Sequence, residues 1–193
     1  IPYDIPSDNQ QYDVETQRLS LNAGYEYLAI PKLDKDAFLL AHVTDWTKHN
    51  LLPGESNIYF KGTYVGTGFI DPAITSDTLS LSLGRDQSIV VKREKLTDFC
   101  KTSTVGGKKR TTKAFKITVH NTKSKQVKLK LKDQIPLTNT SDIEVTVEET
   151  SAAIYNESTG ELIWDMTLAA GESKTVELRY TVKYPKKKRI SNL

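Results

Sequence analysis

Arg85 and Asp86 place a basic and an acidic side chain next to each other near the middle of the chain. The strand pattern changes at this point, so we expect a junction between two domains here. Ligand clefts often form at such junctions, and the pair would supply the best candidate groups if the protein were an enzyme. The simpler explanation is a structural ion pair that braces the junction.

Basic residues gather in one block of the chain, and acidic residues gather in the next. Residues 101–132 contain eleven lysines and arginines and no Asp or Glu, whereas residues 133–177 contain ten acidic residues against Lys174 alone. The basic block could form a polyanion-binding face. If strands of the two blocks are neighbours, their outward side chains form cross-strand pairs of roughly 0.2–1 kcal/mol each. Nucleic-acid binding also needs aromatic rings among the lysines, and only Phe115 is present, on the face expected to be buried, so we expect weak or no binding.

Other reactive groups lack the spacing that a site requires. His42 and Asp45 would point to opposite faces of a strand, and no third metal ligand follows at a recognised spacing. Residues 106–108 lack the first glycine and the final hydroxyl of a phosphate loop. Cys100 is the only cysteine, which excludes an intrachain disulfide and leaves its own role and the redox compartment open. We expect no catalytic residue, no metal and no cofactor.

The elements that would hold these residues are β-strands. Phe115, Ile117 and Val119 alternate with polar residues, as in a strand with one wet face. Residues 127–131 repeat the alternation, and the turn residues 121–124 lie between the two runs. This pattern predicts a β-hairpin.

Turn residues divide the whole chain into short runs of this kind. We expect strands near residues 12–21, 25–33, 37–46, 56–65 and 78–83, then 89–96, 112–121, 126–132, 143–149, 153–155, 161–166 and 174–184. The first group predicts an N-terminal β domain of residues 1–84. The second predicts a separate domain of residues 85–193 with a basic tail, and seven strands are typical of an immunoglobulin-like sandwich. The expected fold is therefore all-β, with two β-sandwich-like parts, of which the C-terminal one is immunoglobulin-like with about seven antiparallel strands.

Two aromatic residues are further binding candidates. Trp46 lies at the end of an expected strand, where packing in a core is the usual role and stacking on a ligand the less common one. Tyr64 lies in the next expected strand, within the segment that carries the family resemblance below.

The chain resembles the C-terminal domain of unknown function of mucoidy-inhibitor-A-like bacterial proteins. The resemblance rests on Trp46, Leu51-Leu52-Pro53-Gly54, residues 58–66, residues 77–86 and residues 162–185 with Trp164, Gly171-Glu172, Tyr180 and Tyr184-Pro185. It implies an architecture and no mechanism. It also implies a bacterial envelope protein, periplasmic or extracellular, with an upstream domain and a coiled coil before this piece.

We therefore expect a non-catalytic interaction module of a cell-envelope protein that contacts protein or glycan. Its candidate binding residues are Arg85, Asp86, Trp46 and Tyr64. Its protein partners would include the upstream part of the same protein or an identical subunit. The alternatives are an envelope enzyme with a site at the domain junction and, second, a polyanion-binding module. The longest apolar run is far shorter than the roughly 20 residues that span a bilayer.

Overall fold

The computed structural model describes residues 6–8, 10, 12, 14–73, 77–188 and 190, and within them it is all-β, as predicted. The strands are β1 (Ala23–Ala29), β2 (Asp36–Thr44), β3 (Gly54–Phe60), β4 (Thr63–Ile70), β5 (Thr78–Lys95), β6 (Thr102–Val105), β7 (Lys108–Asn121), β8 (Val127–Gln134), β9 (Glu144–Glu149), β10 (Ile154–Asn156), β11 (Glu161–Leu168) and β12 (Ser173–Pro185). Two short 3-10 helices, η1 (Trp46–His49) and η2 (Thr97–Phe99), interrupt them. None of the described helices is long and apolar enough to cross a membrane.

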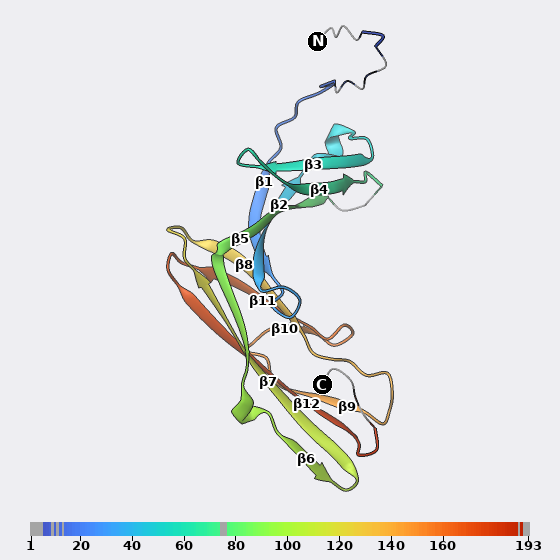
Figure 1. Ribbon diagram of the computed structural model, residues 1–193, viewed down its shortest axis with the longest axis vertical. Coiled ribbons are helices and arrows are strands. Elements are labelled where there is room, and N and C mark those ends of the chain that lie inside the picture. Colours follow the sequence, from blue (N-terminus) through green and yellow to red (C-terminus); the bar gives the residue numbers. More distant parts are fainter. Residues whose placement is uncertain are drawn as a thin grey trace.

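Ten of the strands form one mixed sheet, which does not close on itself (Figure 1). The strand order is β10-β11-β8-β1-β2-β5-β7-β12-β9, and β6 pairs with β7 outside this order. The pairing of β1 with β8 is parallel and the other pairings are antiparallel. β3 and β4 form a separate two-stranded hairpin.

One hydrophobic core joins strands that are far apart in this order. Leu129 of β8 and Leu162 of β11 are buried in the same cluster as Val91 of β5, Ile117 of β7 and Leu178 of β12. In the sheet, β1 and β2 separate these two sets of strands. The sheet therefore bends back on itself so that its inner face surrounds the core.

The structure corrects the strand prediction in the first third of the chain. Residues 14–22 form no strand, and residue 13 of the expected run lies outside the described residues. The apolar alternation in this run finds no neighbouring strand to pair with. Farther on, the single strand expected at residues 56–65 is the hairpin β3–β4. Lys61 and Gly62 form its turn with φ of 50° and 79°, the positive values that two-residue hairpin turns require.

The strands expected at residues 78–83 and 89–96 are one continuous strand, β5, of 18 residues. The first part of β5 pairs with β2 and its last part pairs with β7. β5 thus runs through the expected boundary between residues 84 and 85. Register shifts opposite Arg85 mark a local irregularity at that point.

The predicted hairpin of residues 115–131 is wrong. β7 pairs with β5 and β12, whereas β8 pairs with β1 and β11. The turn instead carries the chain between two parts of the bent sheet. Asn121 is fully buried, and its side-chain amide donates to the carbonyls of Lys125, Leu168 and Ala169 at 2.9, 3.3 and 2.8 Å. The two N–H groups of this buried amide are shared among three carbonyls at the crossing, and no alternation pattern encodes these contacts.

The two charged blocks do meet across strands, as predicted. β8 from the basic block pairs with β11 from the acidic block. Lys132 lies 2.8 Å from Glu161, and Lys130 lies 3.7 Å from Asp165. These pairs neutralise part of the basic block on the outer face of the sheet.

Candidate functional site

Arg85 and Asp86 do not pair with each other, because neighbouring residues of a strand point to opposite faces. The Arg85 guanidinium binds the carboxylates of Asp34 and Asp36 at 3.0 and 2.7 Å. It also lies over the ring of Phe38, 5.4 Å from the ring centre. Arg85 therefore ties β5 to the turn between β1 and β2.

Asp86 connects the two halves of the chain. It accepts hydrogen bonds from the Tyr27 hydroxyl at 2.7 Å, the Lys123 amine at 2.5 Å and the Ser88 amide at 3.0 Å. Tyr27 belongs to β1, and Lys123 belongs to the turn between β7 and β8. The Lys123 amine also lies 5.4 Å from the centre of the Tyr27 ring, a cation–π distance.

The protonation states in this cluster follow from these contacts. Burial alone would raise the pKa of Asp86, but the hydrogen bonds from Lys123, Tyr27 and Ser88 outweigh it and hold the pKa well below its usual value. Burial would likewise lower the pKa of Lys123, and the contact with Asp86 more than reverses this. Burial is the main cause of the raised pKa of Tyr27. The Asp86 carboxylate is thus charged and bonded to three groups of the protein. Such a carboxylate is better suited to stabilising the contact between the two halves than to transferring protons.

A cavity of about 640 Å³ lies beside this cluster, where β1 and β2 of the N-terminal half meet β8 of the C-terminal half. We call it the junction cavity. It is lined by Tyr25, Tyr27, Leu39, Phe60, Lys125, Gln126, Val127 and Lys128. Three aromatic rings and two aliphatic side chains thus meet a rim of two lysines and one amide.

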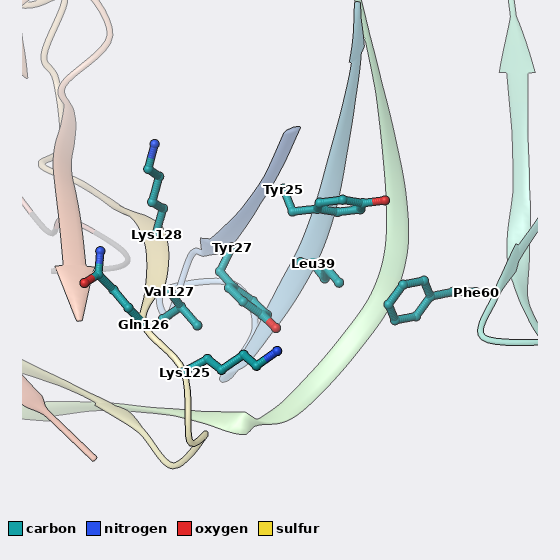
Figure 2. A pocket seen from close by; sticks show the side chains of 8 residues that line it. All are labelled: Tyr25, Tyr27, Leu39, Phe60, Lys125, Gln126, Val127 and Lys128. Carbon is teal, nitrogen blue, oxygen red and sulfur yellow. The ribbon is translucent and has the colours of Figure 1, made fainter. Parts of the chain in front are cut away.

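Figure 2 shows how the side chains around the junction cavity lie. The Phe60 ring comes from the β3–β4 hairpin, on the opposite side of the cavity from β8. Lys125 runs beside Tyr27, whereas Lys128 and Gln126 extend away from the rings. Tyr25 is 59% exposed, so its ring is open to a ligand. Among the described residues, no carboxylate pairs with Lys125.

The other two predicted site residues lie elsewhere. Trp46 in η1 is 2% exposed, so its indole is closed to a ligand. Tyr64 is 51% exposed on β4, where its ring packs edge-on against Tyr59 with the ring centres 5.6 Å apart. Neither residue lines the junction cavity. The structure brings Asp86 to the edge of the cavity through Tyr27 and leaves Arg85, Trp46 and Tyr64 separate from it.

The family assignment rests on nearly the whole chain. Residues 1–186 match the family described as "Domain of unknown function (DUF4139)". The chain belongs to the DUF4139 family. This confirms the expected resemblance as far as a domain of unknown function.

The DUF4139 domain is also similar to "Protein F37C4.5" of Caenorhabditis elegans, to which it is 25% identical over 202 residues. The similarity covers 98% of this chain and 36% of that protein. The DUF4139 chain therefore spans about a third of the length of this relative.

Sequence reasoning missed the residues that build the junction cavity in this DUF4139 domain. Tyr25 and Tyr27 lie two apart in an expected strand, which places their side chains on one face. That spacing was the available signal. Phe60 and Lys125 come from distant elements, and only the bend of the sheet and the position of the hairpin bring them near the tyrosines.

A second group of polar residues lies on β1, β2 and β5 of the DUF4139 domain. Ser80 Oγ lies 2.9 Å from His42 Nδ1, and His42 Nε2 lies 3.7 Å from Glu26 Oε2. A nucleophile, a base and an orienting carboxylate would follow this order. The last distance exceeds a hydrogen bond, however, and Lys130 at 3.2 Å binds the same Glu26 oxygen. The pairing of β2 with β5 brings Ser80 and His42 together, so no residue spacing in the sequence predicted their contact.

The remaining reactive candidates are engaged or isolated. Asp45 binds Lys48 within the same short helix region at 2.5 Å. The half-buried Cys100 thiol accepts the backbone N–H of Ala114 at 3.4 Å. In the part of the chain that the structure describes, no three His, Cys, Asp or Glu side chains group as a metal site.

Proposed function

We propose that this DUF4139 domain is a non-catalytic interaction module whose ligand is a glycan held in the junction cavity. The observation that carries the proposal is the cavity itself, with the open Tyr25 ring, the Phe60 ring and Lys125, which pairs with no carboxylate in the described part of the chain. Concave sites with aromatic walls and a few polar groups are the usual form of small-ligand sites. Sugar rings present flat C–H faces that pack on aromatic side chains, and Lys125 favours an acidic sugar.

A protein, instead of a glycan, is the alternative ligand for this interaction module. A stable protein interface covers about 800 Å² on each partner. The junction cavity is a local hollow with a short rim, so it suits a few sugar units better than such a surface. The exposed Tyr59 and Tyr64 on the hairpin could serve a protein partner.

The test is calorimetric titration with two probes, an acidic oligogalacturonate and a neutral cello-oligosaccharide. We expect saturable binding of the acidic probe, and Tyr25→Ala should weaken it about tenfold, or roughly 1.4 kcal/mol. Tyr59→Ala is the matched control, because Tyr59 is 64% exposed and lies outside the cavity. Equal losses in both variants, or no binding of either probe, would contradict the proposal.

An envelope enzyme is the alternative function, and the contact between Ser80 and His42 is the observation that favours it. Asp86 is held as a charged carboxylate by Tyr27, Lys123 and Ser88, and this argues against catalysis at the junction itself. The same probes separate the two functions. New reducing ends that appear with the natural chain and not with Ser80→Ala would support a hydrolase.

A polyanion-binding module is the second alternative. The exposed Lys128 extends from β8 into solvent and supports it. Lys130 and Lys132 of the same strand are paired with acidic side chains, and this argues against polyanion binding. We propose that nucleic acid is not a partner, because the basic block lacks exposed aromatic rings.

We further propose that the domain belongs to a mucoidy-inhibitor-A-like protein of the bacterial envelope, periplasmic or extracellular. Its partners there would include the upstream part of the same protein or an identical subunit. The support for this placement is the resemblance carried by residues 58–66, 77–86 and 162–185. The module would then hold a glycan near other copies of the assembly.

We also propose that residues 85–193 form an immunoglobulin-like sandwich that supports the binding site. The last part of β5 with β7, β12 and β9 would be one layer, and β8, β11 and β10 the other. The shared core supports this arrangement. We expect a fragment of residues 85–193 to unfold cooperatively, at a lower melting temperature than the full chain. The reason is the loss of the buried Tyr27, Ala29 and Ala37 from the same core.

Thermal unfolding followed by circular dichroism checks this expectation. A second fragment, residues 22–193, retains β1 and β2 and serves as the matched control. It should recover the melting temperature of the full chain. If the 85–193 fragment shows no cooperative transition, the proposed domain boundary between residues 84 and 85 is wrong.

A further inference from the structure

The inner face of the bent sheet changes from apolar to basic toward one end. On β5, Ile89 and Val91 are buried in the core, and Arg93 and Lys95 follow on the same face. On β7, Lys113 occupies the corresponding end of the face that carries the buried Ile117. Inward positions of a sheet rarely carry several charges unless something compensates them.

These side chains line a cavity of about 250 Å³, which we call the basic mouth. Its lining includes Lys32, Arg93, Lys95, Lys113, Phe115 and Tyr180. Lys32 comes from the turn between β1 and β2, opposite β5 and β7. Cationic side chains thus converge from three elements, and the basic mouth shares no residue with the junction cavity.

The protein compensates only part of the positive charge in the basic mouth. The Lys32 amine donates to the Gln134 carbonyl at 3.1 Å. Asp133 is buried and binds Arg93 at 2.7 Å, so that one carboxylate is already used. Glu94 lies on the outer face of β5 and binds Lys92 at 2.8 Å. Among the described residues, Lys95 and Lys113 pair with no carboxylate.

The strand register keeps Lys95 and Lys113 close together. Lys95 lies opposite Phe115, and Lys113 is two residues from Phe115 on the same face. Such diagonal positions are about 7–8 Å apart. Arg93 is held in place over the Phe115 ring, with its guanidinium carbon 3.7 Å from the ring centre. A doubly charged anion between these groups would relieve the repulsion of the lysines.

We propose that the basic mouth binds a phosphate or sulfate group carried by a small molecule. Lysine amines bind such oxyanions through charge-assisted hydrogen bonds, and the adjacent aromatic rings leave room for an attached organic group. The site is separate from the glycan site proposed above. Failure of one therefore leaves the other intact.

Calorimetric titration with inorganic phosphate and with sulfate tests the proposal, at an ionic strength matched with sodium chloride. We expect saturable binding by the natural chain, weakened about tenfold or more in the double variant Lys95→Gln/Lys113→Gln. The matched control is Lys92→Gln/Lys116→Gln, which removes two charges from the outer faces of the same two strands. Lys32→Gln is a second variant from the opposite wall of the basic mouth, and it should weaken binding as well.

The outcomes separate a site from general charge attraction. Binding of phosphate alone, of sulfate alone or of both supports the site and identifies the group it prefers. The Lys95→Gln/Lys113→Gln variant should melt at or above the temperature of the natural chain without ligand, because it removes unpaired like charges. Absence of saturable binding to either anion, or equal losses in the inner-face and outer-face variants, would overturn the proposal.

Discussion

Asp133→Leu is expected to lower the free energy of unfolding by roughly 3–5 kcal/mol, the largest effect of any single change considered for this domain. The Asp133 side chain is 0% exposed and binds Arg93, whose side chain is 19% exposed. Its second oxygen accepts the backbone N–H of Gln134 at 2.7 Å. Removing the carboxylate leaves a largely buried guanidinium without its counter-charge, and that uncompensated charge is the main cost.

A companion change separates the lost ion pair from a general packing defect. Adding Arg93→Met to Asp133→Leu removes the guanidinium that has lost its carboxylate partner. This double variant should therefore regain most of the lost stability. Urea denaturation of the natural chain, both single variants and the double variant gives the coupling energy. Equal stability of Asp133→Leu and the double variant would show that the charge does not cause the loss.

Asp86→Asn is expected to lower the free energy of unfolding by roughly 1–3 kcal/mol at neutral pH. The amide keeps the shape of the side chain but loses the charge that binds Lys123 and orients the Tyr27 hydroxyl. Asp165→Asn is the matched control, because Asp165 is exposed and lies 3.7 Å from Lys130. Exposed pairs of this kind contribute about 0–1 kcal/mol.

The pH dependence of this difference tests its cause. The pKa of Asp86 is lower in the folded chain than its usual 3.8, so its stabilising charge is fully present above pH 3.8. The contribution is lost as the pH falls below 3.8 toward the lower folded value. Urea midpoints measured from neutral to acid pH should therefore converge for the natural chain and Asp86→Asn. A difference that stays constant into the acid range would exclude the charge as its cause.

The positions of the strands followed from local pattern over most of the chain. Alternation of the kind at Phe115, Ile117 and Val119 predicts both a strand and its buried side, because successive residues point to opposite faces. The same rule separates Arg85 from Asp86. Local pattern failed at residues 14–22, where the alternation exists but no neighbouring strand completes the ladder.

The strand partners depended on distant contacts. The turn after β7 reads as a hairpin turn, yet β7 and β8 lie in different parts of the bent sheet. Asn121 distinguishes the two arrangements, because its buried side-chain NH2 donates to the carbonyls of Leu168 and Ala169, which lie at and just after the end of β11 and which a local hairpin would not supply. The parallel pairing of β1 with β8 likewise joins residues about 100 apart in the chain, which no turn between them can specify.

By itself, the sequence determined the all-β class, the buried face of most strands and the meeting of the basic and acidic blocks, because these depend on residue type at a spacing of two. Tertiary structure alone decided where the two cavities lie. The junction cavity needs Tyr25 and Phe60 from separate elements, and the basic mouth needs Lys32 opposite Lys113. Both arise because one sheet bends back on its own core, and that bend is a property of packing between distant strands.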